Sequence, residues 1–405
     1  MSFTFGVVLF ALGIGISIAL HEAGHMWTAK AFGMKVRRYY IGFGPKIFSF
    51  RRGETEYGMK WIPAGGFCDI AGMTALDPVA PDEEPRAFYK KKTWQRVIVL
   101  SAGSIVHFII GTLLLYLVAV GSGLPPIGIV VGDISCAAPA ADPATGQPNP
   151  CGPGDPSPAK AAGLRTGDQI ISVAGTPATD WDQVVTTIRA HAGPTPIVVE
   201  RDDKQLTLQV DVATVSRPLL QGFVPGNKQN HLGNVGAIGV SQLSYIEYGP
   251  LTAVPATIKF TGYMFDRTWL GLKMFPEKVP NVLRAIGGAP RDINGPISVV
   301  GASVIGGDAV EHGAWAFFTF LLATLNFFVG VFNLVPLLPL DGGHVAVNLY
   351  ERVRDTVRRR MGKVAMPPVD YTRLLPLTYV VILVFGAISL LTITADIVNP
   401  IRLPQ

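Results

Sequence analysis

Four long apolar stretches stand out when the hydrophobic and polar positions are followed along the chain. They cover about residues 3–20, 97–120, 314–337 and 374–397, and each is near the roughly 20 apolar residues that a helix needs to cross a bilayer. No basic segment precedes the first stretch and no small-residue cleavage pattern follows it, which argues against a cleaved signal peptide. We therefore predict a polytopic α-helical membrane protein with about four transmembrane helices.

The composition agrees with this prediction. Hydrophobic residues make up 49% of the chain and charged residues only 16%, whereas an average soluble protein carries about 25% charged residues. The net charge of +5 is compatible with nucleic-acid binding, but the sequence has no stacking aromatic motif and no basic helix to favour it. In a membrane protein a basic excess usually belongs to cytoplasmic loops, so we expect a lipid bilayer and no nucleic acid as partner.

Lysine and arginine are concentrated in three segments, at residues 30–60, 86–96 and 352–363. Such segments stay on the cytoplasmic side of a membrane. The N-terminus, the long region between the second and third spans and the C-terminus are then predicted to lie outside the cytoplasm, in a cell inner or plasma membrane. Charged residues interrupt a further apolar stretch at 251–275, and counting it as a span would move the last basic segment outside. We expect an amphipathic helix on the outer surface there.

Between the first two spans, residues 33–72 alternate aromatic and polar side chains and are punctuated by Gly and Pro. This pattern is typical of β-hairpins. Their apolar faces suggest that the hairpins enter the cytoplasmic leaflet, where non-helical backbone is tolerated when it is buried against protein. Gly42, Phe43 and Gly44 in this segment are candidates for clamping an extended substrate by strand addition.

Residues 123–215 are expected to form one compact domain. The run GLRTGDQIISVAG at 163–175, with the helix and alternating strands that follow it, resembles a PDZ domain. The resemblance implies binding of an extended peptide or a C-terminus beside a helix, and a purely packing role is the alternative. The insert at 136–157 contains Cys136 and Cys151, which either form a disulfide or remain free thiols; their spacing leaves both open.

These patterns predict the order of segments along the chain. They are a first span with its motif at 1–32, hairpins at 33–72, a cytoplasmic connector at 73–96, a second span at 97–122, the PDZ-like domain at 123–215, an extracytoplasmic linker with the amphipathic helix at 216–313, a third span with a proline motif at 314–345, a basic cytoplasmic loop at 346–373, a fourth span at 374–397 and a short tail at 398–405. The expected fold class is an α-helical membrane protein with membrane-associated β-hairpins and one extracytoplasmic PDZ domain.

The first span ends in His21-Glu22-Ala23-Gly24-His25, an HExxH motif on a helix. Residues four apart share a helix face, so both histidines can reach one metal ion. Glu22 lies beside them, placed to take a proton from a metal-activated water. Polar residues that merely end a helix are the plainer explanation, but three ionisable groups next to an apolar span are costly and usually functional.

A third protein ligand is expected after the third span. Pro336 and Pro339 break that helix, and Asp341 and His344 lie in the irregular segment that follows. Either side chain can bind zinc, so the residues alone leave the choice open. The first and third spans both run towards the cytoplasm, so topology brings two motifs more than 300 residues apart to one depth.

HEAGH at the end of the first span, NLVPLLPLDGGH after the third, and the PDZ-like domain between them resemble the site-2 protease family and are close to its actinobacterial, mycobacterial-type members. The resemblance covers nearly the whole chain. It implies one zinc ion per chain near the cytoplasmic leaflet, with His21, His25 and Asp341 as ligands. Glu22 is implied as the general base.

The same resemblance implies the substrates. Members of the family cut transmembrane segments of single-pass membrane proteins such as anti-sigma factors, after a prior site-1 cleavage, in regulated intramembrane proteolysis. A zinc-stabilised membrane PDZ scaffold without protease activity is the alternative from another class. A zinc transporter is a third possibility, but it needs polar residues through the depth of the membrane, which the spans mostly lack.

The spans contain a few other polar residues. Asn326 and Asn333 precede the proline breaks, and each either donates to the oxyanion or substrate backbone or packs between helices. His107 lies in the middle of the second span, where a hydrogen-bonded structural role is the better interpretation. Ordinary surface positions are expected for His191, His231 and His312.

Overall fold

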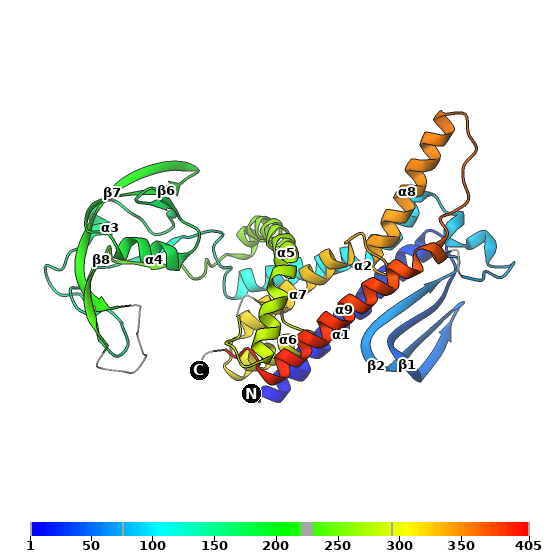
Figure 1. The fold of residues 1–405 in the computed structure, drawn as a ribbon, viewed down its shortest axis with the longest axis horizontal. Coiled ribbons are helices and arrows are strands. Elements are labelled where there is room, and N and C mark those ends of the chain that lie inside the picture. The colour runs from blue at the N-terminus through cyan, green and yellow to red at the C-terminus, as the bar shows by residue number, and fades with distance from the viewer. Residues whose placement is uncertain (1, 75–76, 220–229, 293–294, 404–405) are drawn as a thin grey trace. The chain divides into compact units, whose positions relative to one another are not determined.

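The computed structural model describes residues 2–74, 77–219, 230–292 and 295–403 (Figure 1). The chain forms two compact units. The helical unit comprises residues 1–121 and 250–405, and the inserted unit comprises residues 122–249. Small parts of the predicted connector, linker and tail lie outside the described residues, at 75–76, 220–229, 293–294 and 404–405.

Four helices among the described residues are long and apolar enough to cross a membrane. They are α1 (Phe3–Ala31), α2 (Thr93–Gly121), α7 (Trp315–Asn333) and α9 (Leu375–Val398). Each contains one of the predicted apolar stretches or most of it. All four belong to the helical unit, which fits a polytopic membrane protein.

α1 and α2 pack closely where α1 carries the HExxH motif. Gly24 faces α2, and a Cβ atom at this position would lie 2.9 Å from the carbonyl oxygen of Ala102. Glycine has no Cβ, so it permits this close approach of the two helices. The motif histidines on either side of Gly24 are therefore held near α2.

The segment after α1 forms two long antiparallel strands in the region where β-hairpins were expected (Figure 1). β1 (Val36–Arg52) and β2 (Thr55–Ile70) fold back on each other, so that residues 38–41 of β1 pair with both residues 56–59 and residues 66–69 of β2. Gly53 supplies the positive φ of the tight turn between them. The hairpin packs against α1, while Phe48 and Trp61 are among its exposed apolar side chains. β2 thus runs beside the helix that carries the motif.

The third span ends earlier than predicted. α7 stops at Asn333, a loop follows at 334–340, and α8 (Asp341–Arg360) begins a new helix. Pro336 and Pro339 lie in this loop, where they were expected to break the helix. The irregular segment is shorter than expected, because α8 already starts at Asp341. The basic segment expected as a loop is largely helical, and Asp341 stands at the first position of that helix.

Two further helices pack against the apolar ones. α5 (Pro250–Ile286) includes the stretch expected as a surface helix, and it contacts α2, α7 and α9. The sequence does not predict α6 (Val299–Glu311), because it is short and rich in glycine; it contacts α1, α7 and α9. Much of the predicted linker at 216–313 is therefore helical. Short 3-10 helices lie at Glu84–Arg86, Phe88–Lys90 and Tyr371–Arg373.

The inserted unit combines small sheets with two short helices. Its elements are β3 (Val131–Ile134), α3 (Pro158–Ala161), β4 (Gln169–Val173), β5 (Thr176–Pro177), α4 (Trp181–Arg189), β6 (Gly193–Arg201), β7 (Lys204–Pro218), β8 (Leu232–Ala237) and β9 (Val240–Gln242). The larger sheet has the order β5-β4-β6-β7-β8, and β3 pairs with β9. Ile197, Val199 and Val210 lie fully buried in its aliphatic core.

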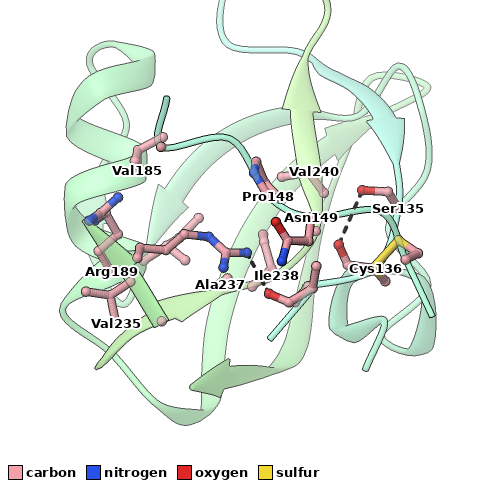
Figure 2. Close-up of a pocket in the computed structure, with 18 of the residues that line it drawn as sticks. Ser135, Cys136, Pro148, Asn149, Val185, Arg189, Val235, Ala237, Ile238 and Val240 are labelled. Carbon is pink, nitrogen blue, oxygen red and sulfur yellow. Dashed lines mark hydrogen bonds between the residues drawn. A yellow bond between two sulfur atoms is a disulfide. The ribbon is translucent and has the colours of Figure 1, made fainter. Parts of the chain in front are cut away.

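The inserted unit is longer than predicted. β8 adds to the edge of the larger sheet and β9 pairs with β3, so the unit extends to residue 249, beyond the predicted end at 215. Pairing between strands distant in sequence leaves no local pattern, which is why the boundary was misplaced. Within the insert, Cys136 and Cys151 form a disulfide with an S–S distance of 2.07 Å (Figure 2).

Candidate metal centre

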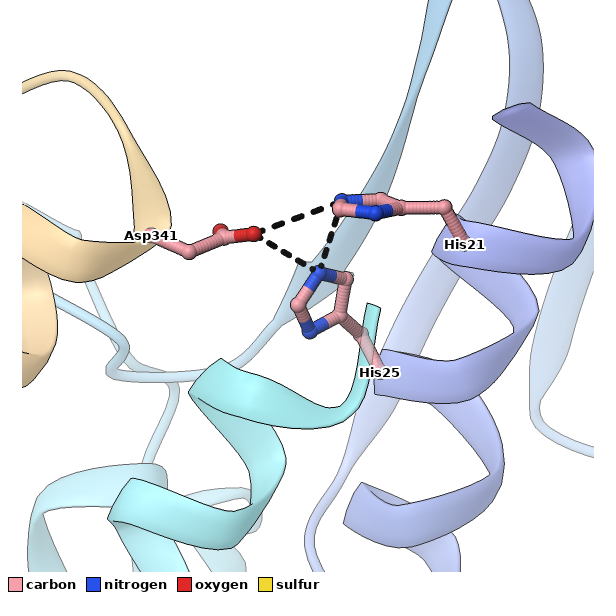
Figure 3. Close-up of side chains that lie close together, drawn as sticks. All are labelled: His21, His25 and Asp341. Carbon is pink, nitrogen blue, oxygen red and sulfur yellow. Dashed lines mark hydrogen bonds and ion pairs between the residues drawn. The ribbon is translucent and has the colours of Figure 1, made fainter. Parts of the chain in front are cut away.

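Two buried histidines of α1 face a carboxylate from α8 (Figure 3). His21 and His25 are four residues apart, so their imidazole rings share one face of the helix. Each histidine is 7% exposed. The side chain of Asp341 reaches the two rings from the first position of α8 and is 18% exposed. The structure thus brings together the three side chains singled out in the sequence.

The facing atoms of these side chains form a nearly equilateral triangle. His21 Nε2 lies 3.2 Å from His25 Nε2 and 3.3 Å from Asp341 Oδ2. The third side, from His25 Nε2 to Asp341 Oδ2, measures 3.4 Å. Protein zinc binds nitrogen and oxygen at about 2.0–2.1 Å in a tetrahedron, whose edges are then about 3.3–3.4 Å long. The triangle has the size of one face of such a tetrahedron, which leaves a fourth ligand position.

The hydrogen bonds around the triangle favour a cation within it. His25 Nδ1 lies 2.7 Å from the carbonyl oxygen of Val99, and because a carbonyl only accepts, this nitrogen carries the proton. With Nδ1 as the donor, Nε2 is the nitrogen available to direct a lone pair towards the other two atoms. The facing Asp341 Oδ2 is buried and has no hydrogen-bond donor among the described residues. This donor set fits zinc.

α2 borders the site at a glycine. A Cβ atom on Gly103 would lie 2.5 Å from His25 Nε2 and 2.6 Å from His21 Nδ1. Protein interiors do not accommodate contacts this short, so any side chain here would displace an imidazole ring. The sequence alone does not mark Gly103, because its role depends on the contact between two helices.

Glu22 lies between the metal-facing histidines and the hairpin. A Cβ atom on Gly66 of β2 would lie 2.9 Å from Cγ of Glu22, so the glutamate packs directly against the strand. The backbone of Cys68, two residues further along β2, also interacts with the carboxylate. Gly66, like Gly103, is a residue whose importance appears only once the chain is folded.

Asn326 pairs with His107 next to the site. His107 Nδ1 lies 2.8 Å from the side-chain oxygen of Asn326, whose amide nitrogen donates to the carbonyl of Leu322 at 2.8 Å. The rings of His107 and His21 are 5.0 Å apart between centroids. Both ends of the Asn326 amide already have partners, which favours the packing role over the oxyanion role for this residue.

The other candidate residues lie outside the triangle. The ring of His344 stacks on Tyr371, and its Nδ1 lies 3.2 Å from the phenol oxygen, so His344 is not the third metal-facing side chain. Asn333 is the last residue of α7. Within β1, Gly42 and Gly44 have positive φ values, and Phe43 between them is 44% exposed.

The remaining histidines lie outside both motifs. His191 and His312 each contact the carbonyl oxygen four residues earlier, at 2.7 Å in both cases. His231 is exposed. None of the three belongs to the metal-facing cluster found among the described residues.

Comparison with known proteins assigns the chain to a family. The family model described as Peptidase family M50 matches residues 9–374. The chain belongs to peptidase family M50. It is 49% identical over 414 residues to "Zinc metalloprotease Rip1" of Mycobacterium bovis, with both chains covered in full. A protein of the same name from Mycolicibacterium smegmatis is 47% identical, again over the full length of both chains. "Regulator of sigma-E protease RseP" of Salmonella typhimurium is 27% identical over 87% of this chain and 92% of that protein.

Membership of the M50 family confirms the predicted relation to the site-2 proteases. The M50 chain is an intramembrane zinc metalloprotease, and its cofactor is Zn²⁺. Its helical unit places it in a membrane as a multi-pass protein. The scaffold and transporter alternatives are therefore set aside.

Proposed function

We propose that this M50 protease holds zinc with His21, His25 and Asp341 and hydrolyses peptide bonds within transmembrane segments. The triangle of ligand atoms carries the proposal, because its sides of 3.2–3.4 Å suit tetrahedral zinc. Two imidazoles and one carboxylate with an open fourth position are a known ligand set of hydrolytic zinc enzymes. Two of the ligands come from α1, a helix apolar enough to cross a membrane, and the third comes from the start of α8. The position of the histidines on such a helix supports hydrolysis of a peptide bond inside the membrane.

Glu22 is the proposed general base. Bound zinc supplies Lewis-acid activation of a water molecule and of the substrate carbonyl. The carboxylate of Glu22 takes the proton of the attacking water and later gives it to the nitrogen of the leaving amine. The side chain of Glu22 packs against Gly66 of β2, and this contact helps to hold the carboxylate beside the two histidines.

Asn333 is the proposed donor to the oxyanion or to the substrate backbone. It ends α7 just before the loop that leads to Asp341, so it lies close in sequence to the carboxylate ligand. Asn326 is less suited to this role, because its amide is bonded to His107 and Leu322. A side-chain amide can stabilise a developing negative charge on the substrate oxygen.

The hairpin is proposed to receive the substrate. A helical substrate must unwind first, because its backbone carbonyl groups are hydrogen-bonded within the helix. Residues 38–41 of β1 pair with β2 on both sides, whereas residues 46–52 pair only with residues 55–60. This half of β1 therefore has one edge without a strand partner among the described residues. An extended segment is proposed to add to this sheet as a further strand, with Gly42, Phe43 and Gly44 as the clamp.

Proline substitutions at residues 46–50 of β1, beyond the native Pro45, are expected to slow cleavage without loss of zinc. Proline lacks the backbone N–H that a substrate strand needs, and one lost hydrogen bond corresponds to roughly a two- to tenfold change in rate. The measurement is reporter cleavage together with zinc content, with alanine at the same position as control. Cleavage unaffected at every position would refute strand addition at β1.

The proposed orientation follows from the basic segments. Arg358, Arg359 and Arg360 end α8, and further lysines and arginines surround the hairpin. Positive segments remain in the cytoplasm, which leaves the N-terminus and the inserted unit outside. The metal site is then near the cytoplasmic leaflet.

The inserted unit is proposed to be a PDZ domain. Its helix α4 contacts β8, the edge strand of the larger sheet. An edge strand beside a helix can take up an extended peptide as an additional strand. This arrangement supports a role in binding substrates or newly formed C-termini.

The proposed substrates are single-pass membrane proteins of the anti-sigma-factor type, cut after a prior site-1 cleavage. The name of one relative, "Regulator of sigma-E protease RseP", supports this proposal. The functional step is regulated intramembrane proteolysis that carries a signal across the membrane. Substrate identity rests on analogy with the relative, whereas the chemistry rests on the site itself.

Removing zinc is expected to abolish cleavage by the purified protein. The protein would be reconstituted in nanodiscs with a truncated single-pass reporter and treated with 1,10-phenanthroline. Metal activation supplies several kcal/mol, so cleavage should fall by at least about a hundredfold. Addition of one equivalent of zinc after removal of the chelator should restore it. Full cleavage by protein shown to be metal-free would contradict the proposed function.

A further inference from the structure

The two metal-facing histidines of α1 differ in the surroundings of their second ring nitrogens. His25 Nδ1 lies 2.7 Å from the carbonyl oxygen of Val99, which accepts its proton. His21 Nδ1 is also buried, but it has no hydrogen-bond partner among the described residues. When Nε2 of His21 directs its lone pair to the metal position, Nδ1 carries the ring proton. This N–H group is a buried donor, and buried donors in proteins almost always have an acceptor.

The acceptor is expected on α2, which borders the His21 ring at Gly103. A histidine that binds a metal ion usually donates its second N–H to a neighbouring group, and this bond fixes the orientation of the ring. Two buried polar side chains follow Gly103 in α2, namely Ser104 and His107. The hydroxyl of Ser104 has no hydrogen-bond partner among the described residues, whereas the ring of His107 lies against the ring of His21.

Asn326 of α7 determines which nitrogen of His107 can accept a proton. The amide nitrogen of Asn326 donates to the carbonyl oxygen of Leu322 at 2.8 Å, so it is the amide oxygen that faces His107. This oxygen only accepts, and His107 Nδ1, 2.8 Å away, is therefore the donor. Nε2 of His107 is then the nitrogen available as an acceptor beside His21.

The spacing of the two rings suits a hydrogen bond between them. Their centres are 5.0 Å apart. A hydrogen bond of about 3 Å between nitrogens of two imidazole rings separates the ring centres by about 5 Å. The ring planes are tilted by 45° to each other. Because the χ2 torsion of histidine is soft, the hydrogen bond needs a local adjustment of the rings and no movement of the helices.

We propose that His107 accepts the Nδ1 proton of His21 and thereby holds the His21 ring towards the metal position. Asn326 in turn holds His107, so the hydrogen-bonded chain runs from α1 through α2 to α7. His107 is a positioning residue, because it acts through His21. This inference rests on the proposed ligand role of His21 and adds a residue of α2 to that site. In a purely structural role, His107 would only join α2 to α7.

Two substitutions of His107 separate these roles. Glutamine places its amide near the position of Nε2, so it can accept from His21 but loses the bond to Asn326. Asparagine places its amide near the position of Nδ1, so it can donate to Asn326 but does not reach His21. Ser104→Ala is the matched control, because it removes another buried polar group from the same helix.

The measurement is the zinc affinity of the purified full chain in detergent micelles, by competition with a chromophoric chelator. His107→Asn is expected to lower this affinity about 10–100-fold, as the loss of a group that orients a metal ligand does. His107→Gln and Ser104→Ala should stay close to the wild-type value. The absorption spectrum of the cobalt(II)-substituted protein reports the ligand geometry independently of cleavage. It should change in His107→Asn and not in His107→Gln.

Thermal unfolding of the metal-free proteins shows whether packing explains the result. His107→Asn keeps the bond between α2 and α7, so it should be at least as stable as His107→Gln. A lower zinc affinity in the more stable variant then cannot come from lost packing. A purely structural role predicts the opposite order, with His107→Gln inferior in both stability and zinc affinity.

Wild-type zinc affinity in His107→Asn would overturn the inference, and so would a larger loss in His107→Gln than in His107→Asn. A loss confined to Ser104→Ala would also overturn it, because the acceptor would then be the serine. His21→Ala is measured alongside. Zinc loss in His21→Ala with unchanged affinity in His107→Asn removes this inference alone, whereas wild-type affinity in His21→Ala contradicts the proposed ligand set.

Discussion

The Gly103→Ala variant is expected to lose its zinc. The added Cβ atom would lie 2.5 Å from His25 Nε2 and 2.6 Å from His21 Nδ1, so at least one ring must turn away from Asp341. Loss of a supporting contact outside the ligands costs about 10–100-fold in metal affinity, and displacing a ligand costs more. We expect zinc affinity to fall by at least about a hundredfold. Competition with a chromophoric chelator measures this affinity, and cleavage should fall with it.

Gly121→Ala is the matched control for this substitution. Gly121 lies in the same helix, and a Cβ atom there meets no atom within 4 Å. The control should bind zinc as the wild type does. Wild-type zinc affinity in the Gly103→Ala protein would show that the histidines do not face α2 in the arrangement described.

The metal-facing residues could be predicted because their signals are local. An HExxH pattern fixes the relation of His21 to His25 within one helix, whatever the rest of the chain does. The choice between Asp341 and His344 did not follow from spacing alone. The folded structure makes the choice clear. Asp341, at the start of α8, points to the two histidines, while the ring of His344 stacks on Tyr371.

The supporting residues could not be predicted, because their roles depend on tertiary contacts. Gly103 and Gly66 each leave space for a side chain from a different element, and a single glycine in a sequence does not reveal what approaches it. The same limit explains the misplaced end of the inserted unit. Strands β8 and β9 are short, and only their pairing with β7 and β3 makes them part of that unit.

The Glu22→Gln variant is expected to keep its zinc and lose most of its activity. Glutamine fills the same space against Gly66 but cannot accept the proton of the attacking water. General-base catalysis contributes about 10²–10⁴ in rate, so kcat should fall by that factor. Single-turnover cleavage of the reporter measures the change. Glu311→Gln is the matched control, since Glu311 is exposed at the end of α6 and distant in sequence from both motifs.

The most direct test of the zinc protease mechanism measures zinc content and reporter cleavage on the same nanodisc preparations of wild type and Glu22→Gln. One zinc ion per chain in both proteins, with cleavage by the wild type alone, is the predicted result. Equal cleavage by the two purified proteins would contradict the role of Glu22 and the proposed mechanism.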